Sequence, residues 1–149
     1  MADTIKTGMP LLVRHAGEWQ GVYTHVDTDN VVIDRHRSHL TCTFPEDGPY
    51  AYMQVNRYTW DDGRTEVNEF PATYRDGRIW WDTPRITGYA WEVDPRTICL
   101  YWQRKDMQGW YLYEMIQLSA CGTKRGRTWH WFENDELVRR TCIKETRIA

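Results

Sequence analysis

The chain has 149 residues and a nearly balanced charge, with 19 Lys and Arg against 21 Asp and Glu. This length suits one domain with a sizeable core, and the balance gives no overall attraction to nucleic acid or an anionic membrane. No apolar run approaches the ~20 residues that a membrane-spanning helix needs. The sequence therefore predicts one domain whose partner is neither a nucleic acid nor a membrane.

The aromatic residues are unusual in kind, because nine Trp and nine Tyr stand against three Phe. Trp and Tyr join a large apolar surface to a hydrogen-bonding group, so they suit strands and ligand cavities. Cys42, Cys99, Cys121 and Cys142 show neither close pairing nor metal-finger spacing, and nothing N-terminal resembles a signal peptide. We therefore expect free thiols in a reducing, cytoplasmic setting.

In chain order, residues 1–10 are predicted as a polar arm and 11–16 as a short helix. From residue 18 onward β-branched and aromatic residues dominate, interrupted by short turn sequences. The Asp-Gly pairs at 62–63 and 76–77 are typical of hairpins, because both residue types tolerate a positive φ angle. The predicted strands are 18–26, 31–44, 50–60, 70–74, 78–82, 85–93, 98–104, 110–118, 125–132 and 137–147.

About nine or ten strands at this spacing are typical of an antiparallel sandwich or barrel. No helical pattern is long enough to cover a flat sheet, so closure of the sheet on itself is the simplest way to protect its edges. We expect an all-β fold in which residues 11–149 form a single up-and-down β-barrel with a short N-terminal helix.

The segment Gly17-Glu18-Trp19-Gln20-Gly21 resembles the Gly-x-Trp opening of the lipocalin and wider calycin barrels. Other segments are similar to those of an uncharacterised bacterial family with calycin-like barrels; they are 34–38, 111–114, 127–132 and 139–145. The resemblance implies that Trp19 plugs one end of the barrel and that an Arg of the last strand, Arg139 or Arg140, packs over it. It implies a fold and leaves the activity open.

Histidines are candidates for chemistry inside such a barrel. His15 precedes the barrel and is predicted to lie on the surface. His36 and His39 differ by three positions and so face opposite sides of one strand, which argues against a shared metal ion. No metal site is predicted. His25 shares a face with Trp19, and His130 lies between two Trp, so these two are the first to test as functional residues.

Two acidic residues stand out. Asp34 lies two positions before His36, so both share a face and can meet one ligand, unless that face is the solvated outside. Glu114 is flanked by apolar and aromatic residues. A carboxyl group there either pairs with Arg127, Arg139 or Arg140, or faces a ligand with a raised pKa.

The strand 50–60 places hydrogen-bonding side chains on one face, which is either solvated or lines the cavity. The residues predicted to act on a substrate are Glu114, His130, His25, Asp34 and Tyr52. Those predicted to contact it are Trp19, Tyr23, Gln54, Asn56, Tyr113, Arg127, Trp129 and Arg140.

The density of ionisable residues among aromatics favours an enzyme, because a simple carrier needs few of them. We expect a lyase or isomerase without a cofactor, in which an acid or base moves a proton on an aromatic or hydrophobic substrate. The alternative is a carrier or sensor of such a molecule, and haem bound through one His is a third. A homodimer is possible if Trp side chains stay exposed.

Overall fold

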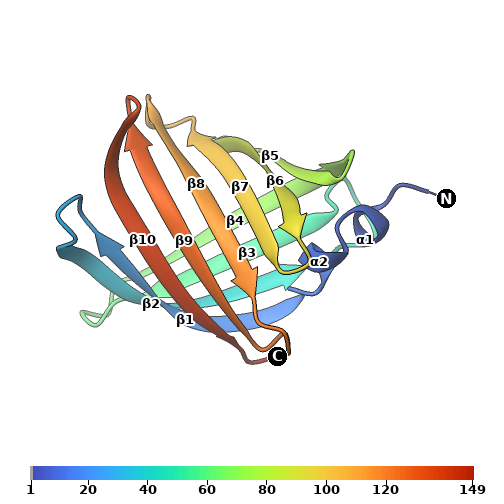
Figure 1. Cartoon of the computed structure of the whole chain (residues 1–149), viewed down its shortest axis with the longest axis horizontal. Coiled ribbons are helices and arrows are strands. Elements are labelled where there is room, and N and C mark those ends of the chain that lie inside the picture. Colours follow the sequence, from blue (N-terminus) through green and yellow to red (C-terminus); the bar gives the residue numbers. More distant parts are fainter. Residues whose placement is uncertain (1) are drawn as a thin grey trace.

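Ten antiparallel strands close into a barrel, and two short helices lie at one of its ends (Figure 1). This computed structural model describes residues 2–149. Each strand pairs with the next along the chain, and the last pairs with the first, so the predicted up-and-down barrel is confirmed. The strands are β1 (Gly17–Val26), β2 (Val32–Thr43), β3 (Tyr52–Thr59), β4 (Thr65–Arg75), β5 (Arg78–Asp82), β6 (Ile86–Asp94), β7 (Thr97–Arg104), β8 (Trp110–Leu118), β9 (Lys124–Glu133) and β10 (Glu136–Arg147).

Turn chemistry sets where several strands end. Asp76 and Gly77, between β4 and β5, have φ angles of 53° and 76°. Asn134 and Asp135, between β9 and β10, have φ angles of 50° and 69°. Two successive residues with positive φ match the right-handed twist of the flanking strands, and Asn, Asp and Gly tolerate that conformation best.

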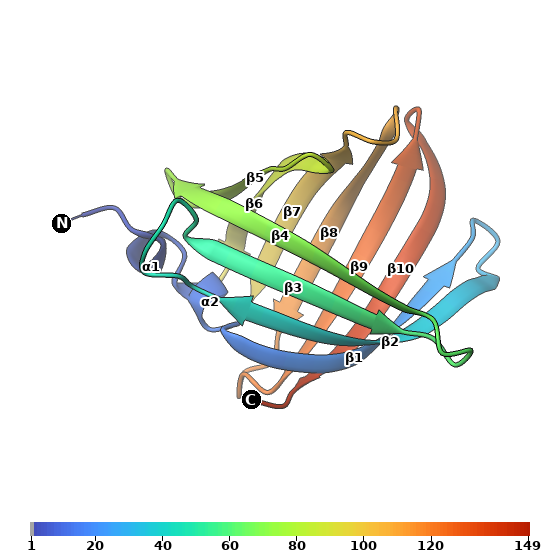
Figure 2. The same ribbon diagram turned by 180° about the vertical axis from the view of Figure 1, so that it is seen from behind.

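The N-terminal segment covers one end of the barrel, as the view from behind shows (Figure 2). Helices α1 (Ile5–Gly8) and α2 (Pro10–Val13) contact β5 and β7 and bury Met9, Leu11 and Leu12. The helix predicted over 11–16 thus begins one residue earlier, where Pro10 suits a first helical position, and ends sooner. Helix α1 lies within the segment predicted as a polar arm.

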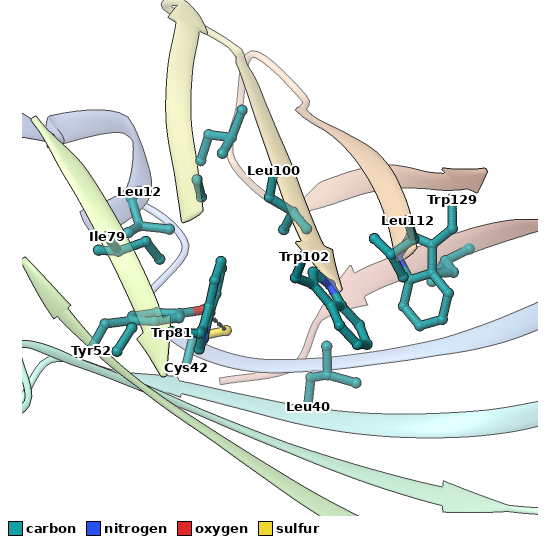
Figure 3. Close-up of a cluster of buried hydrophobic side chains, with 14 of the residues drawn as sticks. Leu12, Leu40, Cys42, Tyr52, Ile79, Trp81, Leu100, Trp102, Leu112 and Trp129 are labelled. Carbon is teal, nitrogen blue, oxygen red and sulfur yellow. Dashed lines mark hydrogen bonds between the residues drawn. The ribbon is translucent and has the colours of Figure 1, made fainter. Parts of the chain in front are cut away.

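Side chains alternate between the barrel interior and its outer face. On β9, Arg125, Arg127, Trp129 and Trp131 are buried, whereas His130 is exposed. Figure 3 shows how apolar side chains from several strands meet inside the barrel, among them Trp81, Trp102 and Trp129. Burial of these side chains is the main stabilisation of such a fold and fixes which face of each strand points inward.

Trp19 plugs the covered end of the barrel, as the resemblance implies. The Arg125 and Arg147 guanidinium carbons lie 4.4 and 4.5 Å from the centroid of its ring. The prediction that Arg139 or Arg140 packs there is wrong. Because β1 and β10 run antiparallel, Trp19 near the start of β1 pairs with Arg147 at the end of β10.

His15 also belongs to this covered end, so its predicted surface position is wrong. The side chain is 1% exposed, and its Nδ1 atom accepts a hydrogen bond from the Arg125 guanidinium at 3.0 Å. Its backbone carbonyl accepts the Trp19 indole N–H at 3.0 Å. Burial and nearby guanidinium groups lower the pKa of His15 to about 2, so the imidazole is neutral.

All four cysteines are free thiols, as expected. Within residues 2–149, the helices are too short and too polar to cross a membrane.

Candidate functional site

A cavity of about 240 Å³ lies inside the barrel. Its lining includes Asp34, which is half-buried, and Glu66, which is exposed. Asp34 lies near the start of β2, whereas Trp19 pairs with Leu40 near the end of that strand, so this part of the cavity is at the end of the barrel opposite Trp19. Its aromatic lining consists of Trp and Tyr side chains rather than Phe, with one exception, Phe70. The rest of the lining is mostly polar or charged and includes Asp34, Gln54 and Glu114, so the cavity offers a small molecule both stacking surfaces and hydrogen-bonding groups.

Three ionisable side chains of β1 and β2 meet on one wall of this cavity. His25, Asp34 and His36 each offer a nitrogen or oxygen atom within 4.8 Å of the other two. Asp34 and His36 share a face because they are two positions apart on β2, and His25 is the register partner of Asp34 on β1. The face of β2 that carries Asp34 and His36 therefore lines the cavity rather than the solvated outside, and His25 joins it from the neighbouring strand.

Hydrogen bonds define the orientation of both imidazoles. His36 Nδ1 lies 3.3 Å from the Arg37 carbonyl oxygen, which can only accept, so Nδ1 carries the proton. The two Nε2 atoms lie 3.0 Å apart, and His25 Nδ1 lies 2.8 Å from Thr141 Oγ1. This pattern assigns the His25 proton to Nε2, which donates to His36, while Thr141 donates to His25 Nδ1.

Both imidazoles are neutral near pH 7. Burial, followed by the neighbouring His36 and Arg139, lowers the pKa of His25 to about 4, and Asp34 opposes this only in part. Burial also lowers the pKa of His36. The Asp34 carboxylate is held by the Trp60 indole N–H, at 3.0 and 3.2 Å from its two oxygens. The cluster thus presents two neutral imidazoles and one oriented carboxylate.

Deeper in the cavity, Glu114 and Arg127 form a buried ion pair. Arg127 Nε donates to Glu114 Oε2 at 2.6 Å, and Arg127 Nη1 donates to the Tyr23 hydroxyl at 2.8 Å. Burial alone lowers the pKa of Arg127, but Glu114, Tyr23 and Glu145 together outweigh burial and raise it well above its usual value. Of the two alternatives for Glu114, the ion pair with Arg127 is present, and the side chain also lines the cavity.

The polar face of β3 points into the barrel, so the solvated alternative is wrong. The Tyr52 hydroxyl donates to Gln54 Oε1 at 2.9 Å, and Gln54 Nε2 donates to Asn56 Oδ1 at 2.8 Å. Asn56 Nδ2 then donates to the Tyr58 hydroxyl at 2.9 Å. Such a ladder satisfies polar groups that would be costly to bury alone.

The structure divides the predicted site residues into three groups. Those that line the cavity are Glu114, His25, Asp34, Gln54, Asn56, Arg127 and Trp129. Those buried beside it or toward the covered end are Trp19, Tyr23 and Tyr52. Those outside the cavity are His130, Tyr113 and Arg140.

The three outside residues are corrections to the predicted site. His130 is exposed and faces away from Trp129 on β9. Tyr113 is 49% exposed and lies beside Tyr101 and Phe132 on the outer surface. His130 and Tyr113 were predicted to face inward because aromatic residues flank them in the sequence. The outer faces of β8 and β9 carry aromatic residues as well, so this signal does not identify the inner face.

Sequence reasoning missed several cavity residues, namely Trp60, Trp81, Trp102, Trp131, Arg85 and Arg139. Trp131 was detectable, because it lies two positions after Trp129 and must share its face. Arg139 was not, since β10 changes register between Leu137 and Arg139.

Two guanidinium groups of the cavity lack a carboxylate partner. Within residues 2–149, Arg85 and Arg139 form no ion pair, although Arg85 donates to Asn68. Arg104, by contrast, pairs with Asp106 at 2.7 Å. The cavity therefore combines an aromatic wall with cationic groups able to bind an oxygen acceptor.

Comparison with solved structures supports the closed antiparallel barrel. A protein of unknown function from the DUF3598 family of Nostoc punctiforme matches 92% of this chain at 17% identity and a TM-score of 0.74. The chain spans about half of that protein, 49% of its length. The S-type phycobiliprotein lyase CpeS from Guillardia theta matches all of this chain and 99% of its own, at 13% identity and a TM-score of 0.73.

A third structure, EF1p2_mFAP2b bound to DFHBI, matches 97% of this chain and all of its own, at 15% identity and a TM-score of 0.51. A scan against protein-family models finds no match, and a search of curated proteins finds none either. At these identities the likeness concerns the fold.

Proposed function

We propose that the protein binds a small, planar aromatic molecule with oxygen acceptors inside the barrel. The observation that carries this proposal is the cavity of about 240 Å³, walled by Trp side chains and furnished with Arg85 and Arg139, which have no carboxylate partner within residues 2–149. Aromatic rings contribute stacking, and guanidinium groups bind carboxylate or carbonyl oxygens through paired N–H donors.

The hydrogen-bonding character of the wall supports the same ligand chemistry. The buried indole N–H groups of Trp81, Trp129 and Trp131 have no acceptor among residues 2–149. Leaving such a buried donor unpaired costs about 1–3 kcal/mol. Each of these nitrogens is covered by neighbouring atoms, so an oxygen acceptor of the ligand would pair with one only after that indole turns toward the cavity.

The comparisons are consistent with the proposal. One barrel with this fold is bound to the small molecule DFHBI, and another is named a phycobiliprotein lyase. A barrel of this fold can therefore hold a small molecule, although the residues here must be judged by themselves.

A second candidate is an enzyme that moves a proton on the bound molecule, of the lyase or isomerase type. The observation that favours it is the convergence of His25, Asp34 and His36 on one wall of a cavity that also carries Trp side chains. Ionisable groups shifted by burial and gathered in a cavity are typical of acid–base sites. Glu114 is less suited to this role because it is ion-paired with Arg127, and Tyr52 because it does not line the cavity.

Tryptophan fluorescence tests the binding proposal. We would titrate the protein with matched aromatic pairs, for example a naphthalene carboxylate and the corresponding alcohol. Saturable quenching is expected, with tighter binding of the carboxylate. Trp129→Phe should lower the quenching, whereas Trp80→Phe, on the outer face beside Arg75, should not. Unsaturable quenching, or equal loss in both variants, would contradict binding in the cavity.

Mass spectrometry of the same mixtures separates the two candidates. A bound molecule that is recovered unchanged supports the carrier. A product of the same mass but altered retention supports an isomerase, and products of lower mass support a lyase. In that case, Asp34→Asn should abolish turnover while binding persists.

A further inference from the structure

We propose that His25, Asp34 and His36 form a binding site for one divalent transition-metal ion at the mouth of the cavity. The proposal is independent of small-molecule binding, since the metal alone is sufficient to test it. The three side chains come from adjacent positions of β1 and β2 and face the same wall. Two imidazoles and one carboxylate are a frequent ligand set for zinc, cobalt and iron ions.

The separation of the ligand atoms suits a single ion. The two Nε2 atoms are 3.0 Å apart, and all three ligand atoms lie within 4.8 Å of one another. Metal–nitrogen bonds of about 2.0–2.1 Å at a tetrahedral angle place two nitrogens about 3.3 Å apart. A widening of a few tenths of an ångström between His25 and His36 therefore admits the ion.

The outer hydrogen bonds are those expected around metal-bound histidines. His36 Nδ1 donates to the Arg37 carbonyl, so its Nε2 presents a lone pair toward His25. In the metal-free arrangement His25 Nε2 donates its proton to that lone pair. Ion binding needs this proton to move to His25 Nδ1, where Thr141 Oγ1, 2.8 Å away, accepts the hydrogen bond.

The third ligand is oriented in the same way. The Asp34 carboxylate accepts the Trp60 indole N–H and the Arg35 backbone N–H, the latter at 2.9 Å. Outer contacts of this type hold a ligating carboxylate in place and raise metal affinity.

The donor set defines the class of ion. Calcium and magnesium prefer shells of oxygen ligands, so two imidazole nitrogens favour a transition metal. Three protein ligands leave at least one position that opens toward the cavity, which is the arrangement of catalytic rather than structural sites. This site departs from the predicted absence of a metal, which rested on His36 and His39 alone.

Cobalt provides the sharpest test. We would titrate the full, tag-free chain with Co²⁺ and record both the visible absorption and the heat of binding. We expect one Co²⁺ per chain with a d–d spectrum typical of nitrogen and oxygen ligands. His25→Ala and His36→Ala should abolish the spectrum, and Thr141→Val should weaken binding about 10–100-fold, as loss of an outer partner does.

Matched controls distinguish this site from adventitious binding. His39→Ala removes a histidine of the same strand whose side chain points outward to Glu18, and it should bind Co²⁺ normally. Cys121→Ser removes an exposed thiol, whose pKa is lowered to about 7 by hydrogen bonds from Thr123 and Ser119, and it should also bind normally. Circular dichroism identifies any variant that fails to fold, and His36→Gln then replaces His36→Ala.

The proposal is overturned if the wild-type chain binds no Co²⁺ at millimolar concentration. It is equally overturned if folded His25→Ala and His36→Gln variants keep the spectrum, or if Cys121→Ser alone removes it. None of these results affects the proposed binding of an aromatic molecule, which is measured without metal.

Discussion

The two ends of the barrel interior treat buried polar groups in opposite ways. At the covered end, Glu145 accepts hydrogen bonds from Arg125 at 2.7 Å and from Arg127 at 3.4 Å, and helices exclude solvent. At the open end, Arg85 and Arg139 lack a carboxylate partner within residues 2–149, and Asp34 contacts an indole instead of a cation.

This difference separates stability from function. Buried charges that neutralise one another hold a structure together, and removing one member leaves the other unpaired. Groups left without a partner beside a cavity cost stability and are retained where they meet a ligand. We therefore assign the covered end to stability and the open end to the proposed ligand site, and substitutions should affect the two ends differently.

The largest effect is expected at the covered end. Glu145 is 1% exposed, and Arg125 and Arg127 outweigh its burial and lower its pKa. Glu145→Gln leaves two buried guanidinium groups without their shared partner, so unfolding free energy should fall by about 3–5 kcal/mol. Urea unfolding measures this. Glu66→Gln at the open end serves as control and should not change stability, and an equal loss in both variants would refute the division.

The pH dependence of stability is the next largest effect. The folded-state pKa of His15 is about 2, below the unfolded value of 6.5, so its contribution is fully present above pH 6.5 and is lost as pH falls. Between pH 7 and pH 5 this amounts to about 2 kcal/mol of lost stability. Urea unfolding at both pH values should show a smaller loss for His15→Gln. Identical losses in both proteins would show that His15 is not buried and neutral.

Two neighbouring arginines of β10 allow a matched comparison, in which the expected change in ligand affinity is smaller than the two stability effects above. Arg139 lines the cavity, whereas Arg140 points outward and donates to Asn30. Loss of a charged hydrogen bond costs about 1.5–3 kcal/mol, so Arg139→Gln should weaken binding of an aromatic carboxylate tenfold or more. Arg140→Gln should bind as the wild type does. The reverse result would place the ligand outside the barrel.

The fold could be predicted from local signals. Asp-Gly turns, alternating strands and the Gly-x-Trp opening defined the barrel, and each depends on residues close in sequence. To predict which Arg packs over Trp19, the pairing of the first and last strands must also be considered. Antiparallel pairing of the first and last strands brings the start of β1 to the end of β10, which indicates Arg147 rather than Arg139 or Arg140.

The site could be predicted only in part, because it depends on register. Asp34 and His36 are visible as a pair on one strand, but His25 joins them through the pairing of β1 with β2. His130 was placed inside because aromatic residues flank it, yet both faces of β9 carry aromatics and only packing selects one. Local sequence therefore defines strand faces, and tertiary pairing decides which face lines the cavity.

The nine Trp residues provide the most direct test of a ligand site in the open half of the barrel. Their indole N–H signals in a ¹H–¹⁵N spectrum can be assigned by single Trp→Phe variants and followed during titration with an aromatic carboxylate. The account predicts shifts for Trp60, Trp102 and Trp129, which line the cavity, and none for Trp19 under Arg125 and Arg147 or for Trp80 on the outer face. Shifts confined to Trp19 and Trp80, with the cavity signals unchanged, would contradict it.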